Sequence, residues 1–112
     1  PLLFRKSGAV ENVGLACPAL GLMLESAYHP ATTQIEPGDA LLLFTDGATE
    51  ILGNEGDDLN REGLIRLVRE QTAGAETPSF QLKKLQEQLL RFSREIHLTD
   101  DLTLVKILRK SR

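Results

Sequence analysis

Two apolar runs of strand length, each bordered by acidic residues, most constrain how this 112-residue chain can fold. Residues 41–44 read Leu-Leu-Leu-Phe and lead, through one threonine, to Asp46. Residues 102–108 form the second run, and Asp100 and Asp101 come directly before it. A carboxylate at the end of a buried strand is costly unless it is solvated, hydrogen-bonded or bound to a cation. If the two acidic ends meet in space, the sequence predicts a site for a hard divalent metal ion.

The composition is ordinary for one soluble globular domain, with 41% hydrophobic and 26% charged residues. A net charge of −3 gives no electrostatic basis for binding nucleic acid or an anionic membrane, so neither is expected as a partner. No apolar run approaches the roughly 20 residues needed to span a bilayer. The single cysteine, Cys17, excludes an internal disulfide and fits a reducing compartment, which predicts a cytoplasmic protein.

The first half of the chain has the pattern of short strands. Residues 2–5 and 10–13 flank a Lys-Ser-Gly turn and predict a hairpin. Residues 27–35 are rich in β-forming residues, and their proline restricts this segment to a sheet edge or a bulge. Residues 36–39, Glu-Pro-Gly-Asp, predict a type II turn that leads into a central strand over residues 40–44.

The second half predicts two helices and a last strand. Asn60 can cap a helix over residues 61–72, and Thr77 with Pro78 is typical of the start of a second helix. Strands followed by a helical pair predict an α+β fold, with a mainly antiparallel sheet and an antiparallel helix pair. Strands that are apolar on both faces also indicate a second sheet behind the first. The apolar stripe of the second helix comprises Leu82, Leu85, Leu89, Phe92 and Ile96.

Three other classes of acidic site do not fit these motifs. In a haloacid-dehalogenase-like alignment the nucleophile would be Phe44, which cannot act. In a response-regulator receiver the acidic pair comes first, whereas here it comes last and no phosphoacceptor strand follows. The acidic loop at residues 54–58 lacks the ligand spacing of an EF-hand.

The order and spacing of residues 20–22, 36–50 and 100–104 resemble those of one known family. They are similar to the C-terminal half of the PPM-type (type 2C) metal-dependent protein serine/threonine phosphatases. The closest branch is the bacterial one that includes the stage II sporulation protein E phosphatase and regulators of stress sigma factors. The resemblance covers residues 2–108, so we expect residues 1–112 to be the C-terminal part of a single phosphatase domain.

The resemblance implies an αββα sandwich, of which this chain would be a truncated half, with a two-metal site for Mn²⁺ or Mg²⁺. By matching motifs, Asp46 and Asp100 would be ligands of the same ion. Gly47, Glu50 and Asp101 would lie around these ligands, with Asp101 orienting or capping rather than ligating. No catalytic side chain beyond the metal ligands is implied.

The resemblance also implies a further aspartate that bridges the two metals and that would precede Pro1. The isolated chain is therefore expected to bind metal weakly and to hydrolyse little. It is also expected to leave a sheet face open, which a homodimer could cover.

The function implied for the full-length parent is hydrolysis of phosphoserine or phosphothreonine on a bacterial regulatory protein. In this branch the implied substrate is a phosphorylated anti-sigma-factor antagonist, and an upstream sensor or receiver domain controls the phosphatase. The alternative is a degenerate phosphatase that serves as a non-catalytic regulatory interaction module.

Overall fold

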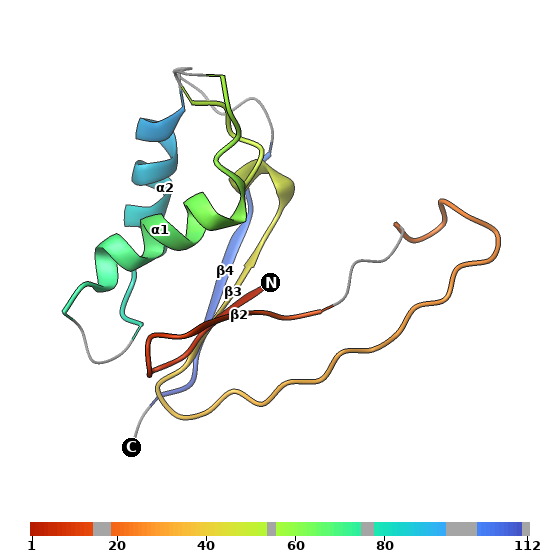
Figure 1. Cartoon of the computed structure of the whole chain (residues 1–112), viewed down its shortest axis with the longest axis horizontal. Coiled ribbons are helices and arrows are strands. Elements are labelled where there is room, and N and C mark those ends of the chain that lie inside the picture. The colour runs from red at the N-terminus through yellow and green to blue at the C-terminus, as the bar shows by residue number, and fades with distance from the viewer. Residues whose placement is uncertain (15–18, 54–55, 75–77, 94–100, 111–112) are drawn as a thin grey trace.

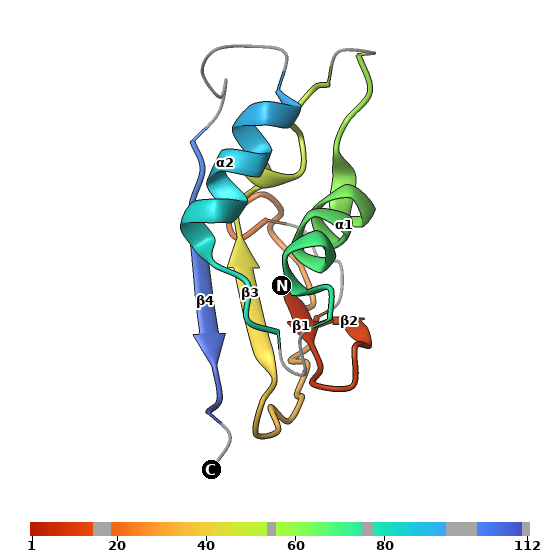
Figure 2. The ribbon, with the colours of Figure 1, turned by 90° about the vertical axis from the view of Figure 1, so that its left-hand side faces the viewer.

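Four antiparallel strands in the order β2-β1-β3-β4 form one sheet, and both α-helices lie on the same face of it (Figures 1 and 2). The structure is a computed structural model that describes residues 1–14, 19–53, 56–74, 78–93 and 101–110. The α+β class predicted from the sequence is confirmed. The strands are β1 (Leu2–Phe4), β2 (Val10–Asn12), β3 (Ala40–Phe44) and β4 (Leu104–Leu108). The helices are the 3₁₀ helix η1 (Asp46–Ala48) and the α-helices α1 (Asn60–Thr72) and α2 (Leu82–Phe92).

Turn chemistry places the strands as the sequence predicted. The first hairpin forms, with Phe4 paired to Val10. At the Pro-Gly turn, Gly38 has a φ of 93°, and the Asp39 N–H donates to the Glu36 carbonyl at 3.0 Å. Glycine adopts this left-handed conformation without steric cost, as a type II turn requires. The turn delivers β3 between β1 and β4, so its predicted central position is confirmed.

The core lies between the sheet and the two α-helices. Alternate residues of each strand point to this face, so Leu42 of β3 is buried while its neighbours Leu41 and Leu43 are only partly so. The helices contribute one apolar stripe each. The largest fully buried core side chains are Phe80, Leu2, Leu42, Leu64, Leu85, Leu89 and Val68.

The predicted cap of the first helix is confirmed. Asn60 has a φ of 55°, and its Oδ1 accepts a hydrogen bond from the Gly63 N–H at 3.0 Å. Asn60 therefore acts as the cap of α1, because its backbone is not helical and its side chain satisfies a free helix N–H. Among the described residues, no helix is both long enough and apolar enough to cross a membrane.

The second helix begins later than predicted. Pro78 lies before α2 rather than in its first turn, and Thr77 and Ile96 lie outside the described residues. The reason is Phe80, which is buried and contacts the Phe4 ring at 5.4 Å between centroids. Placing this ring in the core requires a non-helical approach, so α2 starts only at Leu82.

The segment expected to be β-rich, residues 27–35, forms no strand in the structure. It belongs to an arm, residues 19–35, that runs outside the sheet and helices (Figure 1). Arg5 and Arg109 hold its base by donating to the carbonyls of Gln34 and Ile35, both at 2.7 Å. Its large apolar side chains other than Ile35 are exposed, with Leu20 at 86% and Leu24 fully so.

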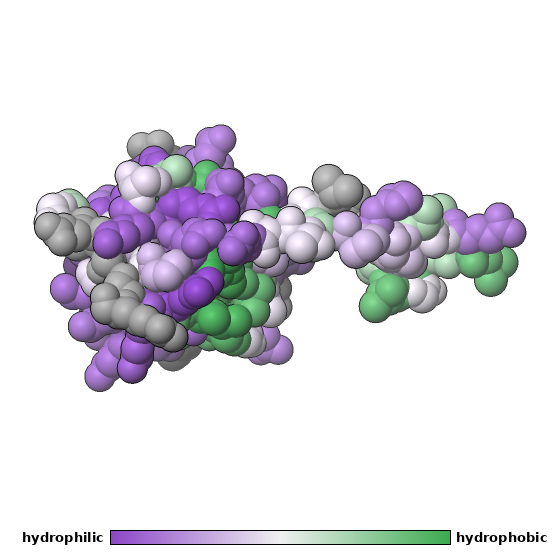
Figure 3. All heavy atoms as spheres, turned by 90° about the horizontal axis from the view of Figure 1, so that it is seen from below, coloured by the Kyte–Doolittle hydropathy of each residue, from purple (hydrophilic) through white to green (hydrophobic). Residues whose placement is uncertain are grey.

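The sheet face away from the helices is also apolar. Leu41 pairs with Ile107 and Leu43 with Val105, which places all four on that face. Val105 and Ile107 are 44% and 46% exposed. Figure 3 shows hydrophobic side chains gathered on the body beside the arm and again along the arm. The described strands form one sheet, so the second sheet and the homodimer stay predictions.

Candidate metal centre

Thr45 joins the two acidic motifs at one end of the β3–β4 pair. Its N–H donates to the Thr103 carbonyl at 3.2 Å, and its Oγ1 accepts from the Thr103 N–H at 3.0 Å. The same hydroxyl donates to the Asp101 carbonyl at 3.3 Å. The threonine thus extends the strand ladder by one residue and fixes the residue after it, Asp46, beside Asp101.

Gly47 lies against the Asp101 backbone. A β-carbon at this position would be 2.1 Å from the Asp101 carbonyl oxygen and 2.9 Å from its carbonyl carbon. Both distances are too short for any real contact, so only glycine allows the two segments to approach this closely. The contact between the Asp46–Gly47 turn and Asp101 is therefore a feature of the backbone, and it requires Gly47.

The turn that carries Asp46 is well anchored. The Asp46 carbonyl accepts from the N–H groups of Thr49 and Glu50 at 3.0 and 2.9 Å. Ala48 and Ile51, one and four residues after Gly47, are buried in the core. The side chain of Asp46 is nevertheless exposed, and within the described ranges no hydrogen bond or ion pair joins its carboxylate to another residue.

Of the other predicted site residues, the structure describes some and not others. Asp101 is exposed and adjacent to Gly47, and Glu50 is exposed at the end of the same turn. Asp100 lies outside the described residues, as does Cys17. In the part of the chain that the structure describes, no three Asp, Glu, His or Cys side chains are grouped to hold a metal ion. The assignment of Asp46 and Asp100 as ligands stays a prediction.

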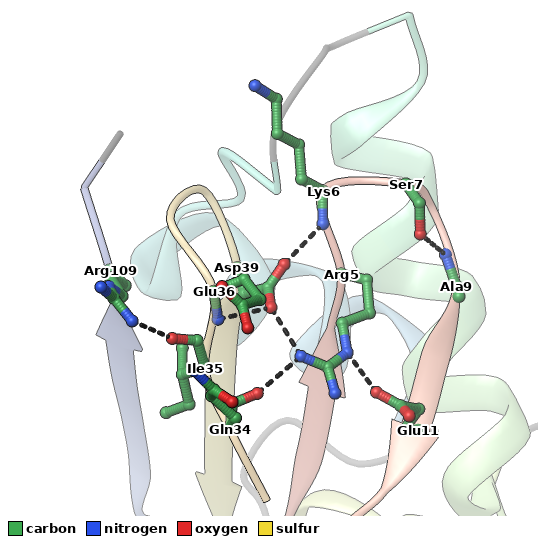
Figure 4. Close-up of polar contacts among 10 residues, drawn as sticks. All are labelled: Arg5, Lys6, Ser7, Ala9, Glu11, Gln34, Ile35, Glu36, Asp39 and Arg109. Carbon is green, nitrogen blue, oxygen red and sulfur yellow. Dashed lines mark hydrogen bonds and ion pairs between the residues drawn. The ribbon is translucent and has the colours of Figure 1, made fainter. Parts of the chain in front are cut away.

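A second polar cluster lies at the opposite end of β3 and was not predicted (Figure 4). Asp39 is only 2% exposed, and its carboxylate accepts hydrogen bonds from three groups. These donors are the Arg5 guanidinium at 2.7 Å and the N–H groups of Lys6 and Glu36 at 2.9 Å each. Arg5 also forms an ion pair with Glu11. The sequence signal for this cluster was an aspartate directly before an apolar strand. Its partner Arg5 is 34 residues away in the sequence, so no local pattern indicates the pair.

Two charged groups, Asp39 and Lys106, have pKa values that the fold shifts. Burial alone would raise the pKa of Asp39, but the hydrogen bonds from Lys6, Arg5 and Glu36 outweigh it and hold that pKa below its usual value. Burial lowers the pKa of Lys106, whose ammonium donates to the Phe80 carbonyl at 2.6 Å. Both groups are bonded to partners within the fold, which indicates structural roles.

Searches for similar proteins agree with these motifs at the level of the family. No curated protein and no solved structure matches the chain significantly. The family model of stage II sporulation protein E (SpoIIE), a family of PPM-type phosphatases, matches residues 1–110. Because this match extends over almost the whole sequence, the chain belongs to the stage II sporulation protein E family.

Proposed function

We propose that the full-length parent protein hydrolyses phosphoserine or phosphothreonine on a bacterial regulatory protein and needs a divalent metal to do so. The observation that carries the proposal is the contact between the Asp46–Gly47 turn and the Asp101 end of β4. This contact gathers acidic residues from two distant motifs, in a chain that belongs to a phosphatase family.

The donor chemistry of this end of the sheet fits Mn²⁺ or Mg²⁺. Asp46 offers an exposed carboxylate on an anchored turn, and carboxylate oxygens are the ligands that hard cations prefer. Asp46 and Asp100 would be ligands of the same ion. When bound, a two-metal centre makes water more acidic and neutralises charge on a phosphoryl group.

The residues of the protein position the metal ligands and do not act as a nucleophile. Thr45 sets the distance between the two strand ends, and Gly47 allows the close approach. Glu50 and Asp101 flank the turn, where they could orient ligands or water. Because two carboxylates on one ion form an incomplete site, we expect the 112-residue chain alone to bind metal weakly and to turn over little substrate.

The physiological context is proposed from the family. The substrate would be a phosphorylated anti-sigma-factor antagonist, and an upstream sensor or receiver domain in the parent would control its dephosphorylation. The single cysteine supports a cytoplasmic location, where such regulators act.

The test compares three single variants of the full-length parent: Asp46→Asn, Asp100→Asn and, as a control, Asp57→Asn in an exposed loop. Release of phosphate from a phosphoserine peptide is measured with and without Mn²⁺, and Mn²⁺ binding is measured by calorimetry. We expect the first two variants to lose at least a hundredfold in activity together with Mn²⁺ affinity, and the control to keep both. Activity that survives in both variants contradicts the assignment. A wild-type parent that neither binds Mn²⁺ nor releases phosphate supports the non-catalytic module.

A further inference from the structure

The arm, residues 19–35, lies on the side of the sheet opposite to the α-helices (Figures 1 and 2). Arg5 and Arg109 hold its root by donating to the carbonyls of Gln34 and Ile35 (Figure 4). Alternation along β1 and β4 directs both arginine side chains to the sheet face that the α-helices leave open. The arm therefore starts on this open face and then leaves it.

The open face is covered at one side and exposed at the other. It carries four partly exposed aliphatic residues, Leu41, Leu43, Val105 and Ile107. Leu3 pairs with Leu41, and Leu41 pairs with Ile107, so these three share one row of the face. Leu3 is fully buried although it is not part of the core beneath the helices, whereas Ile107 is 46% exposed. Cover thus ends partway across the row.

Residues 26–35 have the composition of a segment that is meant to be covered. None of these ten residues is Asp, Glu, Lys or Arg, although 26% of the whole chain is charged. Residues 29–33 make no hydrogen bond within the described part of the chain, and the buried Ser26 hydroxyl has no partner there. Because so few bonds hold the arm beyond its root, little opposes its movement.

One side of the arm matches the open face. Ile35 is half-buried, whereas Gln34 and Glu36 are exposed, so Ile35 faces the sheet. In an extended chain Thr33 and Ala31 lie on the same side as Ile35. Both are small and uncharged, so this side of the arm can approach the aliphatic residues of the face closely.

The arm is long enough to follow the face from one end to the other. At roughly 3.3 Å per residue, residues 27–35 span about 30 Å, and the eight residues from Asp39 to Asp46 span about 26 Å. An arm laid along β3 from its root therefore reaches the candidate metal centre. The apolar turn at residues 20–24, whose leucines are exposed, would then lie beside Asp46.

We propose that residues 27–35 are a strap that closes over the open face of the same chain and carries the apolar turn at residues 20–24 to the Asp46 end of the sheet. Closure buries two apolar surfaces that are otherwise exposed, and the bonded root keeps them at a high local concentration. A second copy would have to bring its arm from solution. The strap needs no metal, and only its consequence, restricted access to Asp46, rests on the proposed function.

The test is paramagnetic relaxation enhancement in the ¹⁵N-labelled chain with EDTA present. Cys17→Ser combined with Glu25→Cys leaves one thiol, on the exposed part of the arm, for a nitroxide spin label. Ile107→Glu places a charge on the open face. Leu90→Glu on α2 is the matched control, because Leu90 is 38% exposed and Ile107 is 46% exposed. Amide spectra that change only near each substitution show that the variants are folded.

We expect the label to broaden the amide signals of Gly47 and Thr103, at the end of the face far from the root. Ile107→Glu should reduce this broadening at least threefold, and Leu90→Glu should leave it unchanged. Broadening only beside the root, or equal broadening in both variants, overturns the proposal.

A mixed sample decides whose arm covers the face. It combines spin-labelled chains without ¹⁵N and ¹⁵N-labelled chains without the spin label. We expect no broadening at Gly47 in this sample, because each strap covers its own sheet. Broadening at Gly47 shows that the arm of a second copy is the cover, and it overturns the proposal.

Discussion

Replacing Gly47 with alanine should separate the two acidic motifs. The new β-carbon would lie 2.1 Å from the Asp101 carbonyl oxygen, about 1 Å inside the closest tolerable contact. The oxygen belongs to the backbone and the position of the β-carbon is fixed by the backbone, so no side-chain rotation can relieve the clash. The β4 end must therefore move away from the turn.

The magnitude follows from the contacts that such a movement breaks. Thr45 makes three hydrogen bonds with Asp101 and Thr103, at 3.0 to 3.3 Å. At about 1 kcal/mol net for each bond, their loss costs roughly 3 kcal/mol of unfolding free energy. The movement would also shift Asp46 relative to the Asp101 end of β4, so Mn²⁺ affinity of the parent protein should fall at least tenfold.

Gly53→Ala is the matched control, because Gly53 is also buried. Its β-carbon would be 2.9 Å from the Phe92 ring, and that contact is with a side chain that can rotate. We expect this variant to cost about 1 kcal/mol and to leave Mn²⁺ affinity unchanged. Urea denaturation followed by circular dichroism measures the stability of each variant, and calorimetry measures Mn²⁺ binding. A Gly47→Ala protein as stable as the Gly53→Ala protein, with unchanged Mn²⁺ affinity, would refute the reasoning.

Three further predictions concern the rest of the fold. Asp39→Asn should cost about 3 kcal/mol at neutral pH, because it leaves the Arg5 guanidinium and two backbone N–H groups facing an amide in place of a carboxylate, whereas Glu11→Gln at the exposed partner of the same arginine should cost far less. The pKa of Asp39 in the folded protein is below the ordinary 3.8, so the stability that its carboxylate contributes is complete above that pH and is lost as the pH falls through the folded pKa. Urea denaturation at decreasing pH should therefore show the unfolding free energies of the wild type and of Asp39→Asn converging. Asn60→Gly should cost only a few tenths of a kcal/mol, since glycine accepts the positive φ, while Asn60→Ala should cost 1 kcal/mol or more; equal losses would contradict the cap assignment. If a homodimer covers the open sheet face, Ile107→Glu should convert it to monomer in sedimentation experiments, and a wild-type chain that sediments as a monomer would disprove this.

Features governed by neighbouring residues were predictable from the sequence. The Pro-Gly turn before β3, the Asn60 cap and the hairpin of β1 and β2 each depend on local backbone chemistry. The patterns of the two acidic ends alone left open whether they meet, and the family resemblance implied that they do.

Features that depend on strand register or on distant partners were not predictable. The role of Thr45 requires that Phe44 pairs with Leu104, which no local pattern specifies. The start of α2 depends on the distant Phe4 ring, against which Phe80 packs, and this contact overrides the local start signal of Pro78.

The two ends of β3 present aspartates that look alike in the sequence but differ in their chemistry. Asp39 is buried, and its carboxylate accepts hydrogen bonds from a guanidinium and two backbone N–H groups, so it is neutralised and closed to a ligand from solvent. Asp46 is held equally firmly through its backbone, yet its carboxylate is exposed and meets no partner in the described residues. A charge used for stability is expected to be neutralised within the fold, whereas a charge used for binding must be rigidly placed and left open. By this criterion Asp39 fixes the turn before β3, and Asp46 is the aspartate available to a cation.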